Sequence, residues 1–222
     1  MKKIREQVGI EVCCSLGLIT KEQAIRLKEA GITRIHCNIE TAPSYFPEVC
    51  STHSMEDKEV IIRTAQEAGI RVCSGGIIGL GESLDQRVEM AFKLKSMHID
   101  SIPMNILNPV KGTPFYTNRR LPPLEVLRTF AMFRFVLPRR SSAPPRPGSE
   151  PPEPAGYALT GGLNGIMVGG YLTTGGRDPK EDIRMTEDPG TLHDQPQLDF
   201  IYNFIQIEIF RTIVKHEYFY YA

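Results

Sequence analysis

Short apolar runs alternate with amphipathic segments over the first 138 residues of the chain. We expect the apolar runs to be strands. The segments between them, whose apolar residues recur at helical spacing, are expected to be helices. Parallel strands need helical crossovers, so this alternation predicts a parallel sheet in an α/β fold. The expected strands are 8–14, 34–39, 71–78 and 101–107, and the helices start near Thr20, Ser54, Ser83 and Pro122.

Local capping signals support three of these helix starts. Thr20 and Ser83 each precede a glutamine by three residues, and Ser54 precedes Asp57 by three. This spacing lets the two side chains cap the first turn of a helix. Gly31 follows the first of these helices, where glycine commonly ends a helix. The boundaries of the predicted helices therefore rest on identified residues as well as on periodicity.

The number of strand–helix units predicts an incomplete barrel. Four units precede residue 138 and one follows it, fewer than the eight of a complete (β/α) barrel. We therefore expect a partial TIM-type barrel, with parallel strands and outer helices, over 1–138, and its last unit over 157–190. The proline-rich stretch 139–156 is expected to be a linker, because proline cannot donate a ladder or helix hydrogen bond. Residues 191–222 form an apolar tail that fits no barrel element.

Composition narrows the class of protein. The 222 residues carry no net charge, which gives no indication of a nucleic-acid partner. No run approaches the roughly 18 apolar residues of a membrane span, so no membrane association is expected. The first residues lack the apolar core of a signal peptide, and we expect a cytoplasmic protein, with an organelle matrix as the other location. Five cysteines, an odd number, argue against a disulfide framework.

Polar residues lie toward the ends of the expected strands, where (β/α) barrels hold their chemistry. Cys13, Asn38, Cys73 and Asn105 come from four strands, and parallel neighbours would aim them into one interior space. Taken singly, each has an ordinary explanation as a core thiol or a hydrogen-bonded core amide. Together they are costly to bury without a purpose, which favours a functional site. Thiolates on neighbouring strands can share a metal or a [2Fe–2S] cluster, which needs four ligands.

Alternation along the second expected strand sorts its polar residues. It places His36 and Glu40 on the same face as Asn38, with Cys37 on the other face. A lone histidine is more often structural than catalytic, so His36 by itself indicates little.

The run SGGIIGLGE follows the third cysteine-bearing strand segment. It is either a tight strand-to-helix turn or a place where the backbone at Gly76 and Gly79 contacts a nucleoside or amino-acid ligand. Its glycines do not follow the G-x-G-x-x-G spacing of dinucleotide-binding turns.

Five blocks of the sequence carry a family resemblance. They are GIEVCCSLGLIT, RIHCNIETAPSYFPEVCSTHSMEDK, AGIRVCSGGIIGLGES, SIPMNILNPVKGTP and ALTGGLNGIMVGGYLTTGG. In this order and spacing, over about residues 5–138 and 157–190, they resemble the biotin synthases. The resemblance implies a radical S-adenosylmethionine (SAM) enzyme that inserts sulfur into dethiobiotin, the final step of biotin biosynthesis. In this family a [4Fe–4S] cluster held by a CxxxCxxC motif cleaves SAM. A [2Fe–2S] cluster bound by three cysteines and one arginine supplies the sulfur.

The resemblance also implies roles for single residues. Cys13 and Cys73 match two ligands of the [2Fe–2S] cluster. Asn38 and Asn105 match positions that hold the ureido ring of dethiobiotin, and an amide can both donate to and accept from that group. An electron donor of the flavodoxin type is implied as a partner, and the resemblance allows a homodimer.

For the SAM cofactor, the resemblance implies a second set of residues. Glu40 matches an acidic position at the SAM ribose, where a carboxylate can accept from hydroxyls. Ile77 matches a position that packs on the adenine, with Gly76 and Gly79 in the same run. His36 and Lys58 match positions at which the family also has site residues, although the residue types at these positions vary.

The chain also departs from the family pattern. The sequence contains no CxxxCxxC motif, and the position of the cluster arginine falls in the proline-rich stretch, where Arg146 has no strand-like surroundings. We therefore expect that this chain alone does not cleave SAM. Two alternatives stay open: a related radical SAM enzyme with another substrate, and a non-catalytic barrel fragment.

Overall fold

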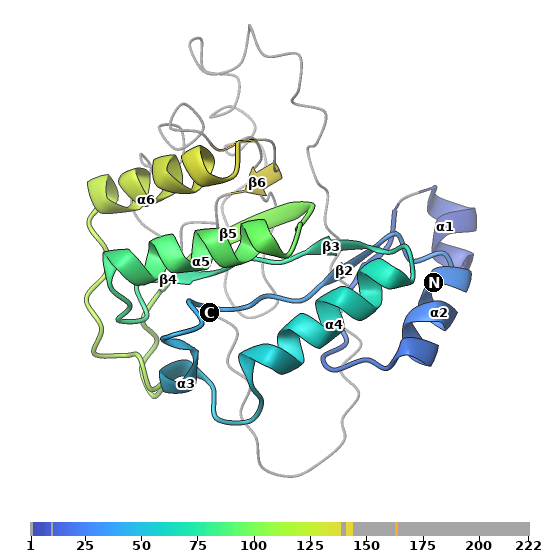
Figure 1. The fold of residues 1–222 in the computed structure, drawn as a ribbon, viewed down its shortest axis with the longest axis horizontal. Coiled ribbons are helices and arrows are strands. Elements are labelled where there is room, and N and C mark those ends of the chain that lie inside the picture. The colour runs from blue at the N-terminus through green and yellow to red at the C-terminus, as the bar shows by residue number, and fades with distance from the viewer. Residues whose placement is uncertain (1, 10, 139–140, 144–162, 164–222) are drawn as a thin grey trace, which may run out of the picture.

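A computed structural model of the chain describes residues 2–9, 11–138, 141–143 and 163 (Figure 1). The described elements are, in chain order, α1 (Lys2–Val8), β1 (Cys13–Cys14), α2 (Lys21–Glu29), β2 (Arg34–His36), α3 (Phe46–Val49), α4 (Met55–Glu67), β3 (Arg71–Cys73), β4 (Gly76–Ile78), α5 (Leu84–Ser96), β5 (Ser101–Ile106), α6 (Pro123–Val136) and β6 (Ser141–Ala143).

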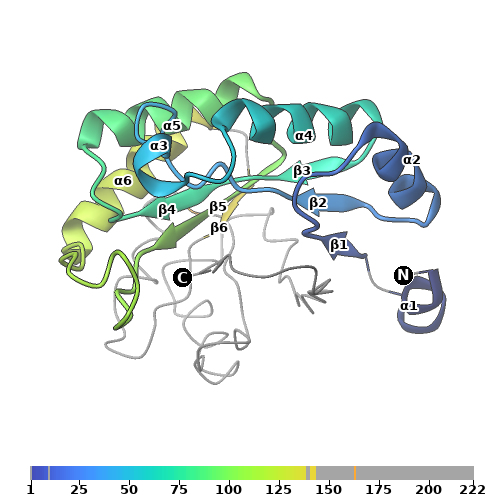
Figure 2. The same cartoon turned by 90° about the horizontal axis from the view of Figure 1, so that it is seen from below.

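The strands form one parallel arrangement. Every strand pair in the described part of the chain is parallel. The order across the sheet is β1-β2-β3-β5-β4, and β6 pairs with β5. Figure 2 shows α4 and α5 along one face of this sheet. The α/β class and the parallel sheet with outer helices are confirmed, as expected when crossover helices pack back on the sheet.

Reciprocal caps open three helices where the sequence indicates them. The hydroxyl of Thr20 accepts from the backbone N–H of Gln23 at 3.3 Å, and the Gln23 side chain accepts from the N–H of Thr20 at 2.8 Å. Each such pair satisfies two backbone donors that a helix start leaves without partners. The same arrangement opens α4 at Ser54 and Asp57 and opens α5 at Ser83 and Gln86.

Three predicted strands are wrong in extent. The predicted strand 34–39 ends at His36, as β2. Val8 ends helix α1, so only Cys13 and Cys14 of the run 8–14 form a strand. The predicted strand 71–78 breaks after Cys73 into β3 and β4. This break lets β3 pair with the start of β5 while β4 pairs further along β5. Gly75 is required at the break, because a Cβ there would lie 1.7 Å from the carbonyl oxygen of Pro103.

Two short elements lie where the sequence predicts none. Helix α3 follows Tyr45 and carries Pro47 in its first turn, where the missing N–H of proline costs no helix hydrogen bond. Strand β6 lies inside the predicted linker 139–156 and pairs with the start of β5. It precedes the first proline of that stretch, Pro144. Apart from β6 and Leu163, which packs in the core, the segments predicted over 139–222 lie outside the described residues.

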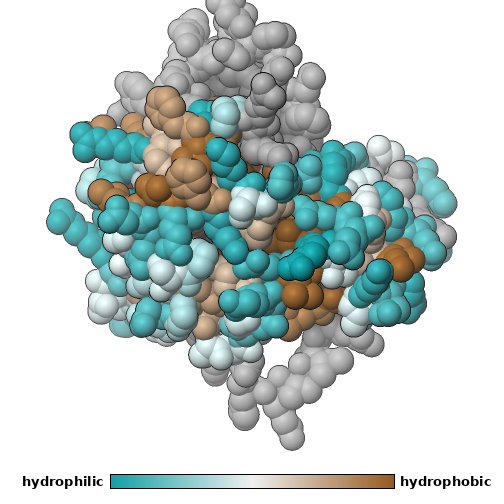
Figure 3. Space-filling view, viewed as in Figure 1, coloured by the Kyte–Doolittle hydropathy of each residue, from teal (hydrophilic) through white to brown (hydrophobic). Residues whose placement is uncertain are grey.

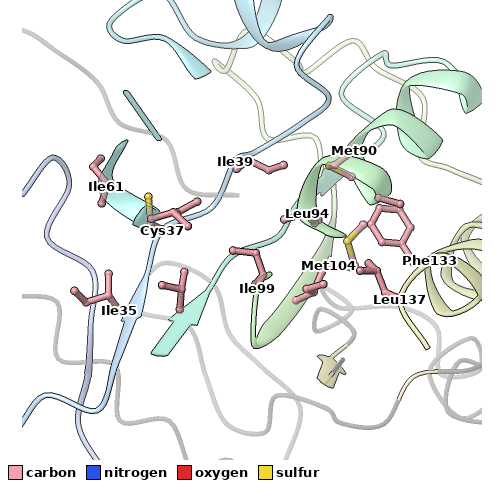
Figure 4. Close-up of a cluster of buried hydrophobic side chains, with 14 of the residues drawn as sticks. Ile35, Cys37, Ile39, Ile61, Met90, Leu94, Ile99, Met104, Phe133 and Leu137 are labelled. Atoms are coloured by element: carbon pink, nitrogen blue, oxygen red, sulfur yellow. The ribbon is translucent and has the colours of Figure 1, made fainter. Parts of the chain in front are cut away.

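The hydrophobic core lies between the helices and one face of the sheet (Figure 4). Ile35 from β2 and Met104 from β5 are buried there together with Phe133 from α6. Cys37 is part of the same core, with Ile61 of α4 nearby in Figure 4. The sulfur of Cys37 therefore faces the helices, as strand alternation predicts. Residues of the opposite parity face the other side of the sheet.

The outer surface of the helices carries some exposed apolar side chains. Figure 3 shows a largely hydrophilic face with apolar side chains gathered over α5 and α6. Phe92 on α5 and Leu124 and Phe135 on α6 are among the exposed apolar residues there. Within the described ranges, no helix combines the length and the apolar character that crossing a bilayer requires.

Candidate functional site

The strand register brings four polar side chains onto the face of the sheet that points away from the helices. Cys13 is the register partner of Arg34, and His36 is the partner of Cys73. Register partners on adjacent strands share a face, and so do alternate residues of one strand. Ile35, between Arg34 and His36, lies in the core on the helix side. Cys13 and Cys73 therefore lie on the same face of the sheet, the one that points away from the helices, on two strands that flank β2.

One buried cation links the two thiols electrostatically. Burial raises the pKa of Cys13 to about 11 and the pKa of Cys73 to about 12. The guanidinium of Arg34, a residue only 6% exposed, lowers both pKa values in part. Negative charge on Cys13 in turn raises the pKa of Cys73. The Cys73 thiol thus responds to Cys13, and both thiols respond to the same guanidinium.

His36 adds an imidazole to this group. Its Nδ1 lies 3.4 Å from the sulfur of Cys73. Burial, and after it the charge of Lys58, lowers the pKa of His36 to about 4. The imidazole is therefore neutral at neutral pH. It can donate to the Cys73 sulfur or accept from its thiol, depending on the tautomer.

A second polar group follows the end of β2. The side-chain oxygen of Asn38 accepts from the backbone N–H of Gly75 at 2.9 Å, and the Asn38 side chain also hydrogen-bonds Glu40. Burial raises the pKa of Glu40, while Lys58 and Asn38 oppose this rise. The Lys58 ammonium lies 3.9 Å from the Glu40 carboxylate. Asn38 therefore orients Glu40 and holds the break between β3 and β4.

The glycine-rich run packs directly against Glu40. The backbone N–H of Ile77 donates to the carbonyl of Glu40 at 2.7 Å. A Cβ on Gly76 would lie 2.5 Å from that same carbonyl oxygen, so only glycine permits this approach. Gly79 has a φ of 96°, a backbone conformation that side chains rarely allow. The run thus places Ile77 beside Glu40, four residues after the end of β2.

The buried carboxylate of Glu82 fixes the backbone conformation of the glycine-rich run. Glu82 accepts from the backbone N–H of Gly79 at 2.8 Å, from that of Gly81 at 3.2 Å, and from Nε of Arg87 at 2.7 Å. The sequence analysis identified neither Glu82 nor Arg87 as part of the site. A charged residue that closes a glycine-rich run, with an arginine five residues later, is the signal that could have indicated them. Arg34 was also missed, although it is the charged first residue of the predicted strand 34–39.

Asn105 lies on β5 opposite Ile77, its register partner on β4. The two side chains therefore share a face of the sheet, and both are half-buried. Within the described part of the chain, no hydrogen bond involves the Asn105 amide. Asn38 and Asn105 come from strands that are not direct neighbours, since β3 lies between β2 and β5.

The donor set fits an iron–sulfur cluster in part. Cys13 and Cys73 are two thiols on one face, and their strands are separated by two strand spacings, about 9.6 Å. A [2Fe–2S] cluster takes four protein ligands, typically thiolates or imidazoles. The described ranges hold no group of three His, Cys, Asp or Glu side chains placed to hold a metal ion. Cys13 and Cys73 could therefore supply two of the four ligands.

Comparisons with known proteins define the class first. The radical SAM superfamily matches residues 1–94, and the Biotin and Thiamin Synthesis associated domain matches 103–192. The crystal structure of methylornithine synthase superposes with a TM-score of 0.71 at 19% identity, covering 84% of this chain and 59% of that one. The hydrogenase maturase HydG from Carboxydothermus hydrogenoformans gives 0.66 at 18%, covering 82% and 47%. At these identities the two structures show likeness of fold alone.

The curated relatives that this chain matches are biotin synthases. The biotin synthase of Pelotomaculum thermopropionicum is 50% identical over 188 residues, which are 83% of this chain and 58% of that protein. The biotin synthase of Geobacter sulfurreducens is 46% identical over 192 residues, 86% of this chain and 58% of that protein. The chain is a homologue of the biotin synthases and spans about 58% of the length of these relatives. The family implies SAM and iron–sulfur clusters as cofactors.

Proposed function

We propose that this chain forms part of a biotin synthase, in which sulfur is inserted into dethiobiotin by radical SAM chemistry. One observation carries the proposal: Cys13 and Cys73 lie on one face of the sheet on either side of Arg34. When bound, SAM and a [4Fe–4S] cluster would supply the radical chemistry and a [2Fe–2S] cluster the sulfur. The sequence contains no CxxxCxxC motif, so SAM cleavage is not expected of this chain alone.

In this proposal Cys13 and Cys73 bind the [2Fe–2S] cluster as thiolates. Burial disfavours the thiolate of each cysteine, and the buried guanidinium of Arg34 partly offsets that cost. Binding of iron removes the thiol proton outright, because a coordinating thiol is deprotonated. Arg34 thus stabilises the charge that the bound cluster and its two thiolates would place on this face.

The substrate would lie against Asn105 and Asn38. The Asn105 amide can donate to and accept from a ureido group, because it has no hydrogen bond within the described part of the chain. The Asn38 oxygen already accepts from Gly75, and its amide bonds Glu40, which leaves one N–H for a ligand. We therefore expect Asn105 to contribute more to dethiobiotin binding than Asn38.

The SAM nucleoside would lie along the run from Gly76 to Gly79. Ile77 offers an apolar side chain on the same face as Asn105, and Glu40 offers a carboxylate beside it. Gly76 and Gly79 allow the backbone to approach a ligand closely. The proposal also includes an electron donor of the flavodoxin type and allows a homodimer.

Anaerobic reconstitution with iron, sulfide and dithiothreitol tests the cluster ligands, because the added thiol can fill the remaining coordination positions. We expect the full chain to gain iron, acid-labile sulfide and visible sulfur-to-iron absorption. Cys13→Ser and Cys73→Ser should each lose most of this signal. Cys50→Ser is the matched control, since Cys50 lies in a loop between α3 and α4, and it should keep the signal. Equal iron binding by all four proteins would contradict the assignment.

A further inference from the structure

A second thiol–imidazole pair lies outside the proposed site, in the loop between α3 and α4. The sulfur of Cys50 is 3.4 Å from Nδ1 of His53 and 3.7 Å from Nε2. The hydroxyl of Thr52 lies 2.9 Å from the same Nδ1. The ring of His53 also packs edge-on against Phe46, with centroids 5.7 Å apart. Thr52 and Phe46 thus hold the imidazole of His53 against the Cys50 sulfur.

The other four cysteines of the chain have thiols whose pKa is raised by burial. Cys14 and Cys37 lie in the core, and Cys13 and Cys73 lie on the face of the sheet that points away from the helices. Burial raises the pKa of Cys13 from 9.0 to about 11, which lowers its thiolate fraction at neutral pH about 100-fold. Burial raises the pKa of Cys14 and of Cys73 to about 12 and also raises that of Cys37. Since the thiolate is the nucleophile, these four react slowly.

Cys50 lies in the loop between α3 and α4 and, like Cys13, is partly exposed. Burial, and after it the charge of Lys58, lowers the pKa of His53, although Asp57 opposes this. The imidazole of His53 is therefore mostly neutral at neutral pH and can accept the proton of the Cys50 thiol.

We propose that Cys50 is a modification site, a nucleophilic thiol assisted by His53 that forms mixed disulfides with low-molecular-weight disulfides. Cys50 transfers its proton to His53, and its sulfur attacks one sulfur of the reagent. The S–S bond of the reagent breaks as the new S–S bond forms, so Cys50 is oxidised and the departing sulfur is reduced. The departing thiolate takes up the proton from His53 and leaves as a thiol. This reaction goes beyond the proposed function, which does not use Cys50.

The test is the order in which the five cysteines react in the native full chain. A limiting amount of 2-hydroxyethyl disulfide is added at neutral pH, remaining thiols are alkylated under denaturing conditions, and peptides are read by mass spectrometry. Cys37 and Cys50 fall in one tryptic peptide and are distinguished by fragmentation. We expect Cys50 to carry the adduct first, with the other four at least about tenfold slower. Faster reaction at any of the other four would overturn the proposal.

The role of His53 is tested with variants that keep the fold. His53→Phe keeps a ring against Phe46 but removes the base, and should slow the reaction of Cys50 at least about tenfold. His53→Asn should also slow it, which guards against a packing effect of the larger ring. His98→Asn, an exposed histidine on another loop, is the matched control and should react as the wild type does. Unchanged rates at Cys50 in both His53 variants would overturn the assignment of the base.

Discussion

The buried ion pair between Glu82 and Arg87 offers the sharpest prediction about stability. The two side chains are 1% and 4% exposed, and Nε of Arg87 lies 2.7 Å from the carboxylate. Arg87 also donates to Glu125 at 2.8 Å and to the hydroxyl of Thr129 at 3.2 Å. Glu82 in turn accepts from two backbone N–H groups of the glycine-rich run. The pair therefore joins α5, α6 and the proposed SAM-binding run.

Arg87→Met leaves the Glu82 carboxylate buried without its cation. Breaking a buried pair in this way costs about 3–5 kcal/mol. Because Glu82 keeps two backbone donors, and methionine keeps much of the apolar stem of arginine, we expect the lower end, about 3 kcal/mol. Arg71→Met is the matched control. This variant removes the ion pair with Glu11, in which the Arg71 side chain is 42% exposed and the Glu11 side chain is 60% exposed. Loss of such an exposed pair should cost under about 1 kcal/mol.

Urea unfolding followed by far-ultraviolet circular dichroism measures both costs. Glu82→Gln should also destabilise the chain. The double variant Glu82→Gln with Arg87→Met should cost less than the sum of the two single changes, because the first removes the charge that the second leaves unpaired. Equal costs for Arg87→Met and Arg71→Met would refute the reasoning, as would strict additivity in the double variant.

Three further predictions concern the site and its supports. Gly76→Ala should cost about 3 kcal/mol in the urea assay, because its Cβ would meet the Glu40 carbonyl oxygen at 2.5 Å; a cost below about 1 kcal/mol would contradict this packing. Ser83→Ala should cost about 1 kcal/mol by loss of the α5 cap, with no change in the urea slope. Burial and the charge of Lys58 lower the pKa of His36 from 6.5 to about 4 on folding. Between about pH 6.5 and about pH 4, the unfolded chain therefore binds a proton at His36 that the folded chain does not bind. Stability should therefore fall by up to about 3 kcal/mol as the pH drops from about 6.5 to about 4. Urea midpoints at about pH 7 and about pH 4.5 should show a smaller loss in His36→Asn, and an identical loss in both proteins would count against the burial of His36.

Local signals made much of the fold predictable. The capping pairs begin at Thr20, Ser54 and Ser83, and each lies within one helical turn, so sequence alone contains the whole interaction. Alternation along β2 also placed Cys37 and His36 on opposite faces, because the strand period of two needs no tertiary information. The sequence also predicted that Cys13 and Cys73 lie on strands of one parallel sheet, and the structure has them on β1 and β3, with β2 between these two strands.

Tertiary contacts decided what the sequence could not show. The break between β3 and β4 arises because the Pro103 carbonyl, from another strand, lies against Gly75. In the sequence, Glu82 and Arg87 resemble the surface charges found near the start of an amphipathic helix. Only the packing of α5 against α6 buries them. Arg34 was missed for the same reason, since its place between two thiols depends on register with β1 and β3.

Iron-edge anomalous scattering from crystals of the anaerobically reconstituted chain tests the central claim most directly. The account predicts iron within bonding distance of the sulfurs of both Cys13 and Cys73, on the face of the sheet opposite the helices. Iron bound at Cys50 or on the outer surface, with the sulfurs of Cys13 and Cys73 free of metal, would contradict it.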